Sequence, residues 1–263
     1  MADSVLVSRD GPLARVTMSR PEVHNAFNED AISGLQAAFD SLREDPGVRV
    51  VVLAGEGRSF SAGADLDWMR RAANWSEEEN RRDAIALAKM LRTIADFPKP
   101  VIARVHGSAF GGGAGLVAVS DIAIASDQAL FGFTEVRLGL APATIAPHVV
   151  EKIGSGRALP LFLTGERFNA ARALEIGLVA RVVPPDALDS AVDEVVAALL
   201  QCGPDAQAAS KALVRAVAGA DRAEVDTYTA DLIGRIRTST EGREGVSAFL
   251  EKRKPSWYPQ DST

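Results

Sequence analysis

Cysteine is almost absent from this sequence of 263 residues, in which Cys202 is the only one. A single cysteine cannot form a disulfide within the chain, which is typical of a protein in a reducing compartment. No apolar run reaches the roughly 20 residues needed to cross a membrane. The N-terminus has neither the apolar segment of a secretory signal nor an Arg-rich amphipathic transit segment. We therefore expect a cytoplasmic protein with no membrane partner.

An excess of positive charge is also missing. The net charge is −6 and the isoelectric point is about 5.2, so no basic face is available to neutralise phosphates, and we expect no nucleic-acid partner. His, Cys and carboxylate residues do not occur at metal-ligand spacings, and no dinucleotide-binding fingerprint is present. The sequence therefore predicts no metal site and no dinucleotide cofactor.

The sequence does contain the alternation of apolar strands and amphipathic helices that is typical of an α/β domain. The continuous β-branched run Val48–Leu53 predicts a strand buried on both faces. Ser76 with Glu79 forms a capping box at the start of a long helix. The expected strands are Val5–Arg9 and Ala14–Met18, which form a hairpin, followed by Val48–Leu53, Val101–Val105, Asp121–Ala125 and Leu178–Val183. The expected helices are Glu29–Arg43 and the capped helix, which starts at Ser76 and ends before Pro98. The C-terminal part is predicted to be helical. We expect a core domain over residues 1–200 and a helical region over residues 201–263.

A glycine triplet, Gly111 to Gly113, lies between the strand Val101–Val105 and a helix of small residues. Glycines at such a turn permit backbone angles and close approaches that a Cβ would prevent. The first N–H groups of the helix are then unbonded at the positive end of the helix dipole. Such a turn suits a phosphate or an oxygen that becomes negative during a reaction.

The triplet is one of four ordered segments by which the chain resembles the crotonase superfamily, also called the enoyl-CoA hydratase/isomerase family. The segments are SFSAGADL (59–66), HGSAFGGGAGLVAVSD (106–121), FGFTEVRLGL (131–140) and LTGERFNAARALEIGLVARVV (163–183). The resemblance extends over nearly the whole chain, from RPEVHNAFN (20–28) to FLEKRKPSW (249–257). It implies an α/β fold with a ββα-spiral core, a helical trimerisation region at the C-terminus, and homotrimers or dimers of trimers. It also implies an acyl-CoA thioester as substrate, so that coenzyme A enters with the substrate and no cofactor is permanently bound.

In this family the thioester carbonyl oxygen lies between two backbone N–H groups. Matched by motif, these belong to Ala64, after the SAG turn, and to Gly112, the middle residue of the triplet. Deprotonation beside a thioester creates an enolate, and one fixed donor of this kind lowers the barrier by about 3–4 kcal/mol in comparable sites. The alternative is that both turns serve only the geometry of the chain.

Hydratases of the family typically carry two glutamates around the thioester. Glu135 matches one of them, and we expect it to act as general base and acid with a pKa raised by an apolar pocket. The other glutamate of the family lies two residues after the glycine triplet, and this chain has Gly115 at that position. With one glutamate, the residues leave open a same-face hydration and a proton shift between C2 and C4, as in the Δ3,Δ2-enoyl-CoA isomerases. A homologue that binds acyl-CoA without turnover is a third possibility.

A finer resemblance concerns the segments 60–80, 106–118 and 133–154. These are similar to the bacterial 3-methylglutaconyl-CoA hydratases of leucine and isovalerate metabolism. Such a substrate carries a second carboxylate that must be paired or solvated in the pocket. Arg137 and His148 are the candidate partners, with Arg70 or Arg71 as further options, although each of the four can also be read as ordinary surface charge.

The resemblance also implies residues around the rest of the substrate. For coenzyme A these are the backbone of Ala62 with its neighbours Asp65 and Leu66, together with the cations Arg20 and Lys252, the latter from either subunit. Asp65 can instead cap or brace its own loop. The acyl pocket is expected to include the remaining candidates Trp68, Met69 and Gly115, of which the two large residues can equally fill the core.

Overall fold

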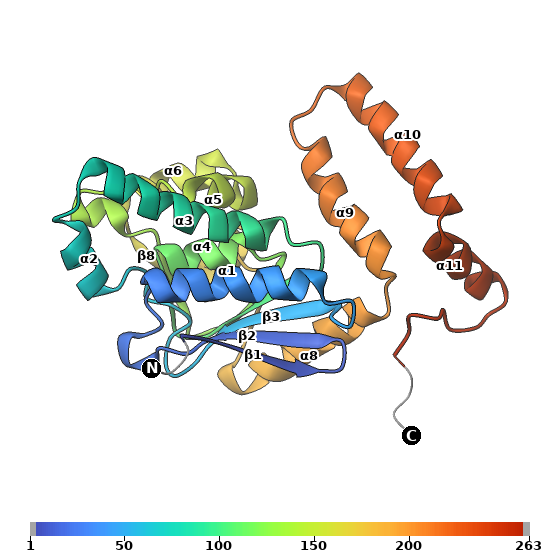
Figure 1. Ribbon diagram of the computed structural model, residues 1–263, viewed down its shortest axis with the longest axis horizontal. Coiled ribbons are helices and arrows are strands. Elements are labelled where there is room, and N and C mark those ends of the chain that lie inside the picture. Colours follow the sequence, from blue (N-terminus) through green and yellow to red (C-terminus); the bar gives the residue numbers. More distant parts are fainter. Residues whose placement is uncertain (1–3, 260–263) are drawn as a thin grey trace. The chain divides into compact units, whose positions relative to one another are not determined.

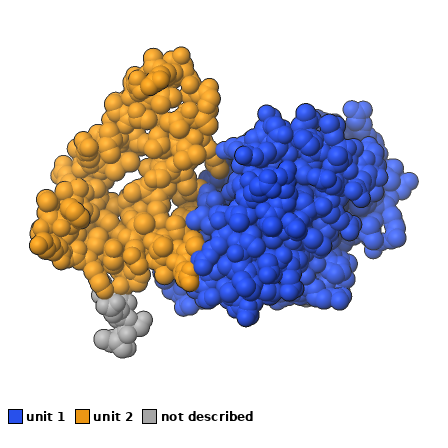
Figure 2. Space-filling view, turned by 180° about the vertical axis from the view of Figure 1, so that it is seen from behind, with its two compact units in different colours: residues 1–97, 101–193 blue, residues 98–100, 194–263 orange. Residues whose placement is uncertain are grey.

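The computed structural model describes residues 4–259. It divides into two compact units, residues 1–97 with 101–193 and residues 98–100 with 194–263 (Figure 2). The first unit is a mixed α/β domain and the second is helical, as the sequence predicts. No helix within residues 4–259 combines the length and the hydropathy needed to cross a bilayer.

The main sheet of the first unit has six strands in the order β1-β2-β3-β4-β6-β9. β1 and β2 form the predicted antiparallel hairpin, and the other neighbours pair in parallel. The strands are β1 (Val5–Asp10), β2 (Leu13–Met18), β3 (Val50–Gly55), β4 (Val101–Val105), β6 (Ile122–Ser126) and β9 (Arg181–Val183). β3 starts later than predicted and β9 is shorter, because the flanking apolar residues are buried without joining the sheet.

A second, three-stranded sheet lies beside the glycine triplet. It consists of β5 (Ser108–Phe110), β7 (Leu130–Gly132) and β8 (Arg167–Asn169) in the order β5-β7-β8. β5 pairs with β7 in parallel, and β7 pairs with β8 in the antiparallel sense. These strands are not predicted from the sequence, because three residues are too few to show a periodicity.

Helices cover the sheet, and recognisable caps mark the residues at which α1 and α3 begin. α1 (Glu29–Glu44) contacts β1, β2 and α3 (Glu77–Ala95), and Figure 1 shows α1 running along the strands. Asn28 caps α1, and the predicted capping box of Ser76 and Glu79 begins α3. The remaining helices of this unit are η1 (Pro21–Val23), α2 (Leu66–Ala72), α4 (Gly112–Val119), η2 (Glu135–Leu138), α5 (Ala146–Ile153), α6 (Ser155–Thr164), α7 (Ala170–Glu175) and η3 (Pro185–Ala187). α8 (Leu188–Leu200) begins in the first unit and ends in the second.

The core lies between the sheet and these helices. Leu35 and Phe39 of α1 are fully buried, and the ring of Phe39 meets Phe97 edge to face at 5.2 Å. Each such side chain contributes about 1.5–3 kcal/mol of burial free energy. α4 is buried along almost its whole length. The glycine turn that begins α4 therefore rests on a closely packed base.

The second unit contains α9 (Pro204–Val217), α10 (Arg222–Thr238) and α11 (Thr240–Leu250). Glu241 on α11 accepts hydrogen bonds from the N–H groups of Asp205 and Ala206, which caps the start of α9. Large apolar side chains on these helices are exposed, among them Val214, Val246, Phe249 and Leu250. Packing of this region against another subunit remains a prediction.

Candidate active site

The segment before α2 is held from both sides. On one side, Ser61 N–H donates to Ser108 O at 3.0 Å and Phe110 N–H donates to Ser61 O at 3.0 Å. On the other side, Phe27 N–H donates to Gly63 O at 2.6 Å and Asp65 N–H donates to Phe27 O at 2.9 Å. The segment is thus held between Phe27 and β5 by isolated bridges on its two sides, with a bend at Gly63, which has φ +91°.

This pairing sets the direction of the Ala64 N–H. Phe27 and Ala64 form a parallel bridge, in which Phe27 bonds to the residues before and after Ala64. The C=O of Gly63, which accepts from Phe27, and the N–H of Ala64 belong to the same trans peptide and point in opposite directions. The Ala64 N–H therefore points away from Phe27, and it has no hydrogen-bond acceptor within residues 4–259. It is available to donate to a group that enters the site.

The glycine triplet forms the neighbouring turn. Gly111 has φ +50°, which disfavours a side chain, and its N–H donates to Gly132 O at 2.9 Å. Gly112 is the first residue of α4, and among the described residues its N–H also has no acceptor. A Cβ on Gly111 would lie 3.9 Å from Gly63 Cα. The two turns, each with an unbonded N–H, are therefore adjacent.

Glu135 lies against the same turn. It begins η2 just after β7, and its Oε1 is 3.2 Å from the position of a Cβ on Gly111. Its Oε2 is buried and has no hydrogen-bond partner in the described part of the chain. Burial raises the pKa of Glu135, and a hydrogen bond from its own backbone offsets only part of this effect. A carboxyl group of this kind is suited to accept and return a proton near neutral pH.

Gly115 lies on α4 in the packed interior. A Cβ at this position would be 2.5 Å from Cγ2 of Ile145 and 3.8 Å from Cδ2 of Leu91. Ile145 itself is almost completely buried. The space beyond Gly115 is therefore filled by Ile145, and a glutamate at this position would require that side chain to move.

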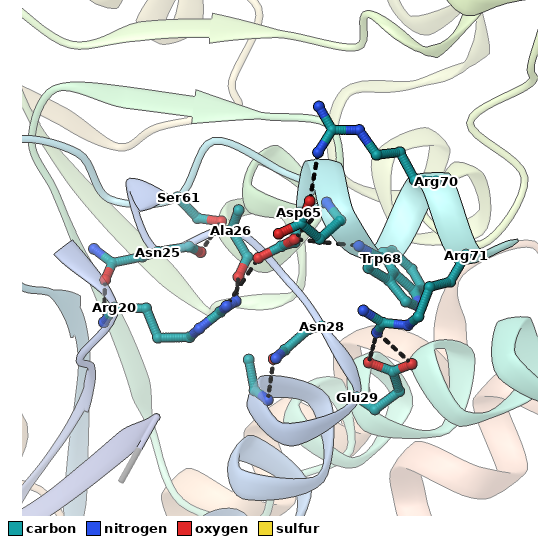
Figure 3. A network of polar contacts seen from close by, with 12 residues as sticks. Arg20, Asn25, Ala26, Asn28, Glu29, Ser61, Asp65, Trp68, Arg70 and Arg71 are labelled. Atoms are coloured by element: carbon teal, nitrogen blue, oxygen red, sulfur yellow. Dashed lines mark hydrogen bonds and ion pairs between the residues drawn. The ribbon is translucent and has the colours of Figure 1, made fainter. Parts of the chain in front are cut away.

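A network of polar contacts surrounds the start of α2 (Figure 3). Asp65 caps the helix by accepting from the N–H groups of Asp67 and Trp68, and it pairs with Arg20 at 2.8 Å. Burial acts to raise the pKa of Asp65, but the hydrogen bonds from Arg20 and from the two N–H groups outweigh it and lower the pKa. Arg71 pairs with Glu29 on α1. These contacts fix α2 and the peptide that precedes it.

The other predicted site residues lie as follows. Trp68 is half-buried and its Nε1 donates to Asp83 on α3 at 3.3 Å, and Met69 is also half-buried. Burial raises the pKa of Asp83. Ala62 N–H is bonded to His24 O, Leu66 and Arg137 are exposed, and His148 is half-buried on α5. Lys252 belongs to the second unit and has φ +52°.

Two residues that shape the surroundings of Ala64, Gly112 and Glu135 are not predicted from the sequence. Phe27 lies under Gly112, where a Cβ would be 2.6 Å from its ring. Ile145 occupies the space beside Gly115. Neither contact has a local sequence signal, because each joins residues far apart in the chain. Within residues 4–259, no cluster of three His, Cys, Asp or Glu side chains is arranged to hold a metal ion.

Comparison with known proteins agrees with the fold. The sequence pattern of the enoyl-CoA hydratase/isomerase family matches residues 9–260. A crotonyl-CoA hydratase of Syntrophomonas wolfei is 34% identical over 257 residues, covering 97% of this chain and 98% of the relative. A trans-2-decenoyl-acyl-carrier-protein isomerase of Streptococcus mutans is 31% identical over 255 residues, covering 96% and 97%. The crystal structure of an enoyl-CoA hydratase from Shewanella pealeana is 39% identical, has a TM-score of 0.94, and covers 97% of this chain and 96% of that one.

The chain therefore belongs to the enoyl-CoA hydratase/isomerase family, also called the crotonase superfamily. Membership makes it an enzyme of the hydratase/isomerase type, with enoyl-CoA thioesters as its class of substrate.

Proposed function

We propose that this enzyme reversibly hydrates a branched enoyl-CoA thioester, converting 3-methylglutaconyl-CoA to 3-hydroxy-3-methylglutaryl-CoA. The observation that carries the hydration chemistry is the carboxyl group of Glu135. Glu135 is half-buried, its Oε2 is buried without a partner within residues 4–259, and its Oε1 lies beside the turn that presents the Gly112 N–H. A proton-transfer group and an anion-stabilising turn thus meet at one place.

The thioester carbonyl oxygen would accept hydrogen bonds from Ala64 and Gly112. Neither N–H has another acceptor in the described chain, so neither must break a bond to receive the substrate. Charge moves onto this oxygen when the substrate becomes an enolate. Fixed donors stabilise that charge by about 3 kcal/mol each in comparable sites.

Glu135 would move the proton in both halves of the hydration. Its carboxylate takes a proton from water while the water oxygen bonds to C3, and the electrons of the double bond move toward the carbonyl oxygen. The same carboxyl then gives the proton to C2, so that one water molecule has been added across C2 and C3. Because one group serves both carbons, we expect the oxygen and the proton to add to the same face.

The branched diacid is supported by the finer resemblance over segments 60–80, 106–118 and 133–154. Its distal carboxylate requires a cation or solvent. Arg70 and Arg71 already pair with Asp67 and Glu29. Arg137 is therefore the stronger candidate, with His148 as the second.

A double-bond isomerase is the alternative, and the packing at Gly115 favours it. Because Ile145 fills the space beyond Gly115, Glu135 is the carboxylate left to act at the thioester. With a 3-enoyl-CoA it could take a proton from C2 and return it to C4, which gives the 2-enoyl-CoA without any water entering the product. The two reactions differ in whether an oxygen atom from water is incorporated.

The test uses purified protein with 3-methylglutaconyl-CoA, crotonyl-CoA and a 3-enoyl-CoA, in water enriched with ¹⁸O. We expect the conjugated absorbance of 3-methylglutaconyl-CoA to fall, and mass spectrometry to find ¹⁸O in the product. Glu135→Gln should lower turnover by about 10²- to 10⁴-fold, whereas the matched control Glu166→Gln, an exposed glutamate, should not. Conversion of the 3-enoyl-CoA without ¹⁸O would favour the isomerase. Tight binding with no reaction on any ester would contradict both.

A further inference from the structure

Arg20 is placed to hold the peptide that carries the Ala64 N–H. Its Nη2 donates to Oδ2 of Asp65 at 2.8 Å, and its Nη1 donates to the carbonyl of Ala26 at 2.5 Å. Only 17% of the Arg20 side chain and 9% of the Asp65 side chain are exposed. Figure 3 shows the guanidinium between these two partners. Two of the five N–H donors of the guanidinium are therefore used inside the protein, and they hold the group in one orientation.

The two partners of Arg20 flank the bridge that orients Ala64. Ala26 precedes Phe27, and Asp65 follows Ala64, while Phe27 and Ala64 form the bridge itself. Arg20 thus joins one strand of the bridge to the other at its edge. Asp65 also starts α2 through the N–H groups of Asp67 and Trp68. A shift of Asp65 would move the Ala64 peptide and the helix together.

We propose that Arg20, acting through Asp65, is a positioning residue that aims the Ala64 N–H at the thioester oxygen. This inference rests on the proposed use of Ala64 as an oxyanion donor, and it holds for hydration and isomerisation alike. It replaces the expectation that Arg20 binds the phosphates of coenzyme A. The guanidinium is held between Asp65 and Ala26, and with 17% of its side chain exposed it presents little surface to those phosphates.

The two roles of Arg20 make different demands on the substrate. A phosphate ligand matters only when the substrate carries the nucleotide part of coenzyme A. A positioning residue matters for every thioester, because the carbonyl oxygen is common to all of them. The experiment therefore compares 3-methylglutaconyl-CoA with the N-acetylcysteamine thioester of the same acid, which lacks the nucleotide.

The variants are Arg20→Met, Arg20→Lys and Asp65→Asn, with Arg9→Met as the control. Arg9 also joins a carboxylate and a carbonyl, those of Asp45 and Gly11, but on the hairpin side of the domain. We expect Arg20→Met to lower kcat about tenfold to a hundredfold with both thioesters, with KM changed by less than about twofold. Lysine, which presents a single ammonium, should restore part of the rate. Asp65→Asn keeps the helix cap and carries the test if Arg20→Met does not fold.

A second readout does not depend on turnover. The saturated 3-methylglutaryl-CoA, labelled with ¹³C at the thioester carbon, reports the strength of the hydrogen bonds to its carbonyl through the infrared stretch. In the wild-type protein we expect the carbonyl stretch of the bound ester to lie below its frequency in solution. In Arg20→Met and Asp65→Asn the frequency should move part of the way back to the solution value, and in Arg9→Met it should stay at the wild-type value.

Three results would overturn the proposal. If Arg20→Met raised KM for the CoA ester and left the N-acetylcysteamine ester unaffected, Arg20 would be a phosphate ligand. If Arg20→Met left kcat and the carbonyl stretch unchanged and only lowered the melting temperature, Arg20 would be a structural brace. A wild-type protein that binds the labelled ester without shifting its carbonyl would remove the oxyanion role of Ala64. By contrast, wild-type protein that shifts the carbonyl but turns over no ester would contradict the proposed function and leave the positioning role supported.

Discussion

The Oε1 atom of Glu135 lies 3.2 Å from the place that a Cβ atom would take on Gly111. The acid thus packs against the backbone of the turn, one residue before the N–H of Gly112. The N-terminus of a helix favours negative charge, whereas burial disfavours it. Burial raises the pKa of Glu135, and a hydrogen bond from its own backbone acts against this effect.

Replacement of Gly111 by alanine should therefore reduce activity more than stability. The residue has φ +50° and ψ −120°, a conformation in which a side chain costs about 1–3 kcal/mol. The added Cβ would also press on the Glu135 carboxyl. Gly177→Ala is the matched control, because Gly177 has φ +82° with nothing within 4 Å of the added atom. We expect similar losses in the free energy of unfolding for the two variants, and a fall in kcat for Gly111→Ala alone. Equal kcat values would contradict the close packing of the acid on the turn.

Glu135→Gln should stabilise the protein, and the gain should grow with pH. Because the pKa of Glu135 is raised in the folded state, the folded protein binds this proton more tightly than the unfolded chain does. Stability is then lost as the pH rises from the ordinary carboxyl pKa to the raised value. The glutamine variant does not titrate and avoids this loss. Melting temperatures measured from pH 4 to pH 8 should diverge toward the alkaline end and coincide toward acid, with Glu166→Gln following the wild type throughout.

Asp65→Asn should show the opposite pH dependence. The pKa of Asp65 is lowered in the folded state, because the hydrogen bonds from Arg20 and from the cap N–H groups outweigh its burial. Its contribution is then complete above the unfolded pKa of about 3.8 and is lost as the pH falls through the folded value. The variant should melt below the wild type at neutral pH, and the difference should shrink below pH 4. A difference that stays constant in acid would contradict the charged pairing with Arg20.

Local signals account for the parts of the fold that the sequence analysis predicted. The capping box of Ser76 and Glu79 gave the start of α3, and the β-branched run gave β3. The strands β5, β7 and β8 escaped prediction because a three-residue strand is defined by its partners and not by its own pattern.

The candidate site likewise contains residues that have a local sequence signal and residues that have none. Ala64, Gly112 and Glu135 could be named because each belongs to a recognisable segment. The pairing of Arg20 with Asp65 could not be predicted, since the two residues are 45 positions apart and the resemblance implies that both lie around coenzyme A. The same holds for Ile145 beside Gly115, where the sequence shows a missing acid but not what fills its place.

The contact between Gly115 and Ile145 can be measured with a double-mutant cycle. Gly115→Ala places a Cβ 2.5 Å from Cγ2 of Ile145, and overpacking of this kind costs about 1–3 kcal/mol. Ile145→Ala removes that Cγ2 and leaves a cavity at a cost of about 2–5 kcal/mol. In the double variant the new Cβ occupies part of the cavity, so the free energies of unfolding should be non-additive by about 1 kcal/mol or more in the favourable direction. Urea denaturation of the four proteins gives this coupling. Strict additivity would mean that Ile145 does not fill the space beyond Gly115, and a second carboxylate could then be introduced there by Gly115→Glu without the companion change.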